Sequence, residues 1–116
     1  MAATKNPLGR LGHIRDEIKG ITVALRGTSH DTFIDNYLLR RAAERALLII
    51  SEAAKALPND LTDRYPKIDW RGVRGLGDVL RHDYERVDPD TLWEILTEKL
   101  PERAPIAARM IDDLER

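Results

Sequence analysis

The chain has 116 residues, of which 34% are charged and 42% hydrophobic, and its formal net charge is −1. This length suits one domain, residues 1–116, with one modest core, and the near-neutral charge does not indicate a nucleic-acid or membrane partner, although it allows a local basic patch. The absence of cysteine rules out disulfides and thiol chemistry and fits a cytoplasmic protein. No apolar run is long enough to span a bilayer, and the first residues lack the apolar centre of a signal peptide.

The first predicted helix covers residues 8–27, because apolar residues recur there at spacings of three and four. Gly27 is a candidate for its C-cap. The helix is expected to bury one stripe, made of Leu11, Ile14, Ile18, Ile21 and Leu25.

The second predicted helix is the longest, and Ser29 or Asp31 is expected to be its N-cap. Pro58 ends this helix or starts a new short one. Apolar residues lie on more than one of its sides, so we expect it to pack on more than one side. In so small a protein the second contact is expected to be another subunit. The buried stripe is expected to consist of Ile34, Leu38, Ala42, Ile49, Ala53 and Leu57.

Two further helical regions are predicted. Residues 70–86 are expected to form a helix that Asp69 caps. The last region begins with Asp88 as cap and Pro89 in its first turn. Because proline breaks the helical hydrogen-bond ladder, a kink or split is expected near residue 100, caused by Pro101 and Pro105. No strand pattern competes in the sequence, and the expected fold is an all-α up-and-down bundle of four or five helices.

Polar side chains able to perform acid–base and phosphate chemistry gather on the helix predicted over residues 70–86. Arg74, Asp78 and His82 lie at i, i+4 and i+8, so they share one face, which Arg81 adjoins. Tyr84 is expected at the edge of the apolar stripe, with its ring buried and its hydroxyl outside. This combination of residue types favours a functional site.

Two glycines in the same helix strengthen that interpretation. Gly75 and Gly77 stand in the helix interior, where each costs about 1 kcal/mol relative to Ala. Their missing side chains let another backbone or a ligand come close. The alternative is a solvated face with glycines that serve only tight packing, and with two surface ion pairs. Those pairs would join Arg74 to Asp78 and Arg81 to Glu85.

Other candidate residues give weaker signals. His13 and His30 stand alone, without a second ligand at metal spacing, and are expected at the surface or at a helix cap. Glu52 lies in an apolar stretch, and we expect it to be paired within the bundle, with an arginine as the natural partner. The basic cluster of the long helix fits salt bridges better than phosphate contacts, and consists of Arg40, Arg41 and Arg45 beside Glu44.

The order of four segments resembles the HepT-like members of the HEPN superfamily. These segments are "RLGHIRDEI", "AAERALLIISEAAKALP", "YPKIDWRGVRGLGDVLRHDYERVD" and "LWEILTEKLP", and the resemblance runs from about Arg10 to Leu114. It implies a small helical homodimer whose partner is a minimal nucleotidyltransferase of the MntA type. In such pairs the HepT protein is a toxin with metal-independent ribonuclease activity, and the antitoxin silences it by transferring AMP to a tyrosine.

The family motif is an arginine followed by a polar residue, then a histidine and, two residues on, a tyrosine. Carried over to this sequence, the histidine is His82, the tyrosine Tyr84 and the polar residue Asp78, while the arginine position holds Gly77. The residue that the family uses to hold the scissile phosphate is therefore missing at its expected place. Two arginines on the same face are candidates to replace it, Arg81 and Arg74, of which Arg81 adjoins the histidine.

The resemblance implies a mechanism without metal or cofactor. RNA would bind in a cleft between two subunits, His82 would act as general base or acid, and Arg81 or Arg74 would stabilise the charge on the phosphorus centre. Tyr84 would position the phosphate and accept AMP, whose bulk and charge would block RNA. Two other hypotheses stay open. Loss of the arginine could leave a non-catalytic partner of the nucleotidyltransferase, or the chain could be a structural helical dimer unrelated to RNA.

Overall fold

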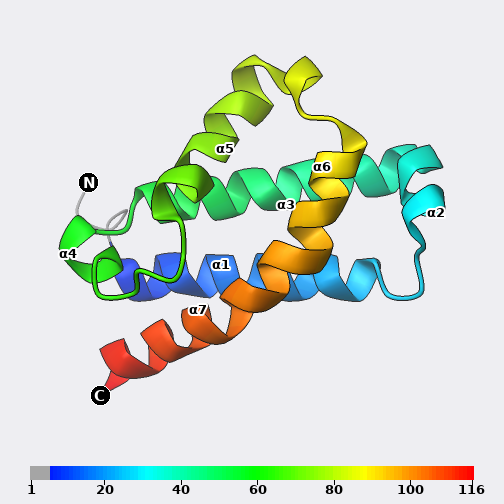
Figure 1. Cartoon of the computed structure of the whole chain (residues 1–116). Coiled ribbons are helices and arrows are strands. Elements are labelled where there is room, and N and C mark those ends of the chain that lie inside the picture. Colours follow the sequence, from blue (N-terminus) through cyan, green and yellow to red (C-terminus); the bar gives the residue numbers. More distant parts are fainter. Residues whose placement is uncertain (1–5) are drawn as a thin grey trace.

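The computed structural model describes residues 6–116, and every regular element in this stretch is helical (Figure 1), as the sequence predicted. The longer helices are α1 (Pro7–Ala24), α3 (Tyr37–Lys55), α5 (Trp70–His82) and α7 (Leu100–Glu115). The shorter elements are α2 (His30–Asp35), α4 (Asn59–Thr62), the 3-10 turn η2 (Tyr84–Arg86), α6 (Pro89–Glu94) and the π-helical segment η3 (Ile95–Lys99).

The helices pack in two crossing directions. α1 and α3 run antiparallel and side by side, whereas α5 crosses the C-terminal half of α3, and α6, η3 and α7 form a continuous rod that crosses the pair obliquely (Figure 1). The core lies where these helices meet, and its largest fully buried side chains include Phe33, Leu11, Leu47, Leu92, Leu100 and Met110. In the part of the chain that the structure describes, no helix is long and apolar enough to cross a membrane.

The sequence predicted the buried face of the first helix correctly and that of the long helix only in part, since Ala53 and Leu57 are buried as expected. Leu11, Ile14, Ile18 and Ile21 are buried on α1, and Leu25 is half-buried just after it. On α3, by contrast, Leu38 is 76% exposed. Ala42 is also exposed and Ile49 is half-buried. The side that faces the core is formed by Ala43, Ala46, Leu47, Ile50, Ser51, Ala53, Ala54 and Leu57.

The long predicted helix is also two helices. Asn36 leaves the helical conformation, with φ −100° and ψ 101°, and separates α2 from α3. Its side chain accepts a hydrogen bond of 2.9 Å from the backbone N–H of Leu39, so it caps the new helix. The apolar pattern runs through this point without interruption, which is why periodicity alone predicted a single element.

The predicted helix starts are confirmed. Ser29 accepts a hydrogen bond from the Thr32 N–H, Asp69 accepts one from the Gly72 N–H, and Asp88 accepts one from the Thr91 N–H. Pro58 immediately precedes α4, where it starts a new short helix. Pro89 occupies the first turn of α6.

The predicted disturbance near residue 100 is a change of helix type within one rod. The segment Ile95–Lys99 is π-helical, and Pro101 stands in the first turn of α7 immediately after it. Pro105 is tolerated inside α7. A π-helical turn inside an α-helix is an established way of accommodating a local break in the hydrogen-bond ladder.

The helix predicted over residues 70–86 is shorter than expected. α5 ends at His82, because Asp83 takes φ −150° and ψ 44°, and the chain then enters the 3-10 turn η2. Tyr84 therefore does not continue the apolar stripe of α5. The prediction for its ring and hydroxyl falls on a side chain that lies outside the described part of the structure.

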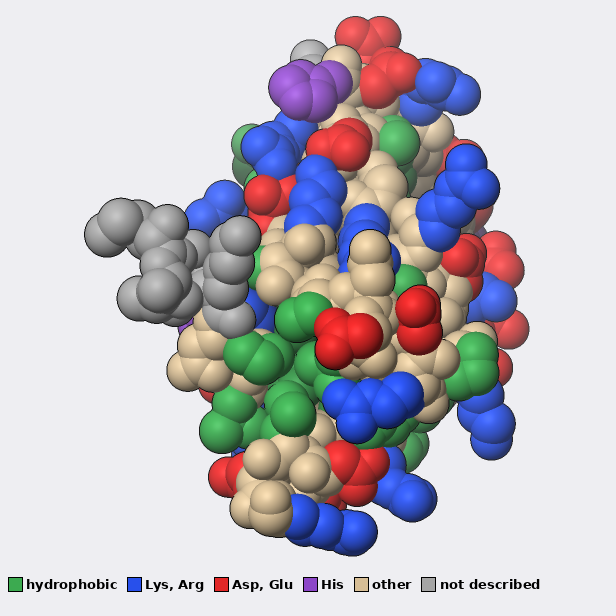
Figure 2. Space-filling view, turned by 90° about the vertical axis from the view of Figure 1, so that its left-hand side faces the viewer, with side chains coloured by type: hydrophobic (Ala, Val, Ile, Leu, Met, Phe, Trp, Pro, Cys, Tyr) green, Lys and Arg blue, Asp and Glu red, His purple; other side chains and the backbone are tan. Residues whose placement is uncertain are grey.

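Charged side chains of both signs cover the surface. Figure 2 shows Lys and Arg side chains interspersed with Asp and Glu over the face turned toward the viewer. This mixture agrees with the net charge of −1. Any anion-binding function must therefore come from a local arrangement of cations, and not from the field of the whole molecule.

Candidate functional site

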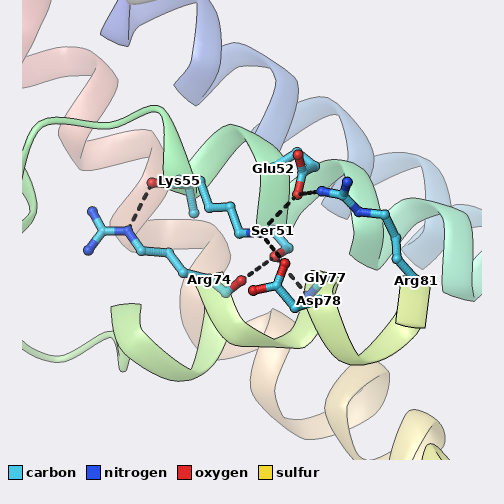
Figure 3. Close-up of polar contacts among 8 residues, drawn as sticks. Ser51, Glu52, Lys55, Arg74, Gly77, Asp78 and Arg81 are labelled. Atoms are coloured by element: carbon cyan, nitrogen blue, oxygen red, sulfur yellow. Dashed lines mark hydrogen bonds and ion pairs between the residues drawn. The ribbon is translucent and has the colours of Figure 1, made fainter. Parts of the chain in front are cut away.

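The site begins at the closest approach of α5 to α3. Ser51 on α3 is fully buried, and its hydroxyl donates a hydrogen bond of 2.9 Å to the carbonyl oxygen of Arg74. The Ser51 hydroxyl oxygen also accepts a hydrogen bond of 2.9 Å from the backbone N–H of Gly77 (Figure 3). Because Gly77 is buried and lacks a side chain, the two helix backbones come close enough for a single serine to bridge them.

This contact leaves no space for a side chain at position 77. A Cβ atom built there would lie 2.5 Å from Ser51 Oγ and 2.9 Å from Ser51 Cβ. It would also lie 3.4 Å from an Oε2 atom of Glu52. The absence of arginine at position 77 and the presence of serine at position 51 are thus a matched pair in this packing.

The next turn of the two helices carries a chain of ion pairs. Arg81 Nη2 forms a short ion pair with Glu52 Oε2, Lys55 Nζ lies 3.3 Å from the same oxygen, and Lys55 also binds Asp78 Oδ1 at 2.5 Å (Figure 3). The sequence prediction that Glu52 pairs with an arginine is confirmed. The hydrogen bond from Arg81 is the main cause that lowers the pKa of Glu52, and the hydrogen bond from Lys55 is the main cause that lowers the pKa of Asp78.

Arg74 lies elsewhere. Its Nε donates to the carbonyl of Ala54 at 3.1 Å, and its Nη2 donates to the carbonyl of Leu57 and to Thr62 Oγ1, each at 3.3 Å. Arg74 thus binds the C-terminal end of α3, and Figure 3 shows it directed away from Arg81. The predicted surface pairs of Arg74 with Asp78 and of Arg81 with Glu85 are wrong, because Asp78 pairs with Lys55 and Arg81 with Glu52.

His82 is the last residue of α5, and it is exposed. It directly follows Arg81, and Asp78 lies one helical turn before it. The nearby charge of His82 adds, after Lys55 and Arg81, to the causes that lower the pKa of Asp78. Three predicted site residues, Asp78, Arg81 and His82, therefore share one end of α5.

The sequence analysis missed two members of this arrangement. Ser51 and Lys55 are each 23 residues or more from their partners on α5, and no local pattern joins them. A weak signal exists for Ser51, since this polar residue lies four positions after the buried Leu47 and three before the buried Ala54, on the same helix face. Paired with a glycine in a later helix, such a residue can mark a helix crossing.

The remaining candidates take surface roles. Arg41 forms the predicted salt bridge with Glu44, at 2.8 Å, and Arg40 donates to the carbonyl of Ile34. His30 is at the surface, where its Nε2 lies 2.6 Å from Asp90 Oδ1. Among the described residues no group of three or more His, Asp or Glu side chains is arranged to hold a metal ion.

The profile of the family described as "Ribonuclease HepT-like" matches residues 14–110. A protein of Caldanaerobacter subterraneus subsp. tengcongensis named "Putative RNase" is 34% identical over 98 residues, which cover 84% of this chain and 88% of the relative.

Archaeal relatives agree with this match. A protein of Thermococcus cleftensis named "Probable ribonuclease HepT" is 35% identical over 78% of this chain and 83% of its own length. A "Putative RNase" of Methanocaldococcus jannaschii is 36% identical over 74% of each chain. No solved structure matches. The family match covers more than half of the sequence, and the chain belongs to the ribonuclease HepT-like family.

Proposed function

We propose that this protein is a metal-independent endoribonuclease of the toxin type, in which His82 performs acid–base catalysis and Arg81 binds the scissile phosphate. The observation that carries the proposal is the position of the Arg81 guanidinium. It pairs with Glu52 Oε2, the atom that lies 3.4 Å from where a Cβ of residue 77 would stand. Arg81 lies one helical turn after Gly77 in α5. Its guanidinium thus lies on the side of position 77, where the family has the arginine that this chain lacks.

The reaction follows from the chemistry of these two side chains. Neutral His82 removes the proton of a ribose 2′-hydroxyl while the O2′–P bond forms, and the P–O5′ bond then breaks as protonated imidazole returns a proton to O5′. Arg81 stabilises the charge that develops on the phosphate oxygens. The products are a 2′,3′-cyclic phosphate and a 5′-hydroxyl, and the two proton transfers need no metal.

A dimer would complete the cleft. One exposed face of α3 carries Leu38, Ala42, Arg45, Ile49 and Glu52 at spacings of three and four, apolar in its first half and charged in its second. We propose that a second copy packs on the apolar half, which would place two helical domains of residues 1–116 around one RNA-binding cleft. The exposed Leu38 and Tyr37, at 76% and 59%, support this interface.

Control by a nucleotidyltransferase of the MntA type belongs to the same proposal. Tyr84 stands in η2, two residues after His82, and its phenol is the proposed acceptor of AMP in the cytoplasm. AMP attached there would add negative charge and bulk beside the phosphate site, so RNA would be excluded by repulsion and by volume.

The first experiment compares the protein with its His82→Ala variant on total cellular RNA in the presence of EDTA. We expect cleavage that resists EDTA and is lost in the variant, and Arg81→Gln should reduce it strongly while Arg71→Gln, an exposed position on the same helix, should not. Equal cleavage by parent and His82→Ala would contradict the proposal. Circular dichroism of each variant checks that the fold is retained.

A second candidate function rests on Gly77. If the vacated arginine position abolishes catalysis, the protein is a non-enzymatic partner of the nucleotidyltransferase. Expression without that partner would then leave growth unchanged, while the two proteins would still co-purify. The double variant Ser51→Gly, Gly77→Arg separates the candidates, because it removes the hydroxyl and Cβ that exclude a side chain at position 77. Activity that appears only in the double variant would support the non-enzymatic partner.

A further inference from the structure

A second concave surface adjoins the Arg81 end of the site. It is a groove of about 330 Å³ between α1 and α3, which Arg81 near the end of α5 also lines. α1 contributes Arg10 and His13, and α5 contributes Arg81. The side of α3 that lines it consists of Arg45, Leu48, Ile49, Glu52 and Ala53.

The charge of this groove differs from that of the whole chain. Three arginines and a histidine face one carboxylate, Glu52, whose charge Arg81 and Lys55 already compensate. Within residues 6–116, Arg45 and His13 have no hydrogen-bond or ion-pair partner, whereas the other cations of α3 bind a carboxylate or a carbonyl. The groove therefore contains one cation, Arg45, that binds no carboxylate or carbonyl within residues 6–116.

We infer that this groove binds the backbone phosphates of the RNA strand next to the scissile phosphate, an inference that rests on the proposed ribonuclease function. Arg45 and Glu52 are seven residues apart on one face of α3, so the groove extends about 10 Å along the helix at a rise of 1.5 Å per residue. A strand whose scissile phosphate lies at Arg81 would continue directly over Arg45, with His13 and Arg10 on its other side. The half-buried Leu48 and Ile49 give the floor an apolar part on which a base can rest.

The test measures binding without cleavage. A short, fluorescent single-stranded RNA with 2′-O-methyl groups throughout cannot be cut, since its attacking hydroxyls are blocked. Its affinity for the full-length protein is measured by anisotropy over a range of KCl concentrations. We expect Arg45→Gln to weaken binding by about fivefold. We also expect it to reduce the slope of log K against log KCl concentration by about 1, the value for one lost phosphate contact. His13→Asn is expected to weaken binding less.

The matched control is Arg64→Gln. Arg64 is an exposed arginine in a larger pocket of about 660 Å³ between the segment that follows α4 and α7, so its substitution removes the same charge from another concave surface. We expect no loss of affinity in this variant.

Equal effects of the two variants would overturn the inference, because RNA would then respond only to net charge. Unchanged affinity in Arg45→Gln would also overturn it. So would displacement of the RNA by ATP at an equal concentration of phosphate groups, because the groove would then bind any nucleotide phosphate and not an RNA strand. Loss of binding in Arg45→Gln without any cleavage of ordinary RNA by the parent protein would support the groove and contradict the proposed function. Cleavage by the parent protein with unchanged binding in Arg45→Gln would support the proposed function and contradict the groove.

Discussion

Two glycines of α5, two residues apart, should respond in opposite ways to the same added methyl group. Gly77→Ala places a Cβ 2.5 Å from the Ser51 hydroxyl, and the shift that follows should lower the free energy of unfolding by about 1–3 kcal/mol. Gly75→Ala meets no atom within 4 Å and should raise it by about 0.5–1 kcal/mol, because alanine favours the helix. Urea unfolding of both variants measures the difference. A stabilised Gly77→Ala variant would contradict the close contact.

At the scale of elements, Arg74 joins the start of α5 to the end of α3. Its guanidinium binds the carbonyls of Ala54 and Leu57 and the hydroxyl of Thr62, which is 2% exposed. Arg74→Gln should therefore lower the free energy of unfolding by about 1–3 kcal/mol. Arg71→Gln, an exposed position in the first turn of the same helix, should change it by less than about 0.5 kcal/mol. Similar unfolding midpoints for both variants would show that these contacts contribute little.

A second link, between α2 and α6, should respond to pH. The hydrogen bond to Asp90, followed by the contact with Asp31, raises the pKa of His30 above its usual 6.5. A pKa raised by folding means that the stabilisation is fully present below the unfolded value and is lost as the pH rises through the folded value. When the pH is raised from about 6 to about 9, the free energy of unfolding of the parent protein should fall by more than that of the His30→Gln variant. Melting temperatures of both proteins at each pH test this, and parallel curves would contradict it.

The elements also show which features a sequence can predict. Ser29, Asp69 and Asp88 were predicted as caps because a cap is a contact within three residues, so its signal is local. The buried face of α3 was predicted only in part, with Leu38 and Ala42 wrong and Ala53 right, because apolar residues lie around much of that helix. Which of them faces the core depends on where α1 and α5 pack, and periodicity does not contain that information.

The same limit applies to the candidate site. His82 is a candidate because it recurs at helical spacing with Arg74 and Asp78, and Arg81 adjoins it. The pairing of Glu52 with an arginine followed from a charge in an apolar stretch. The pair of Lys55 with Asp78 joins two helices, and the crossing that brings them together depends on Ser51 and Gly77. No pattern within either helix records that crossing.

At the scale of the whole molecule, the proposed dimer depends on the exposed first half of α3. Leu38→Glu should convert a dimer to a monomer in light scattering, because it places a charge in an apolar interface. Since Leu38 is 76% exposed in the single chain, the melting temperature of the monomer should hardly change. The control is Val23→Glu on α1, where the side chain is 47% exposed, and it should leave the mass unchanged. A monomeric parent protein at micromolar concentration would rule out the composite cleft.

The contact between Ser51 and Gly77 also constrains how this sequence can change over generations. Arginine can occupy position 77 without a steric overlap only if position 51 loses its side chain. Yet Ser51→Gly alone removes two hydrogen bonds, worth about 1 kcal/mol each, and adds a glycine, which favours a helix less than serine does. The opposite order begins with a steric overlap. Both mutational paths therefore cross a less stable intermediate, so single substitutions cannot easily bring arginine to position 77 while this contact is present.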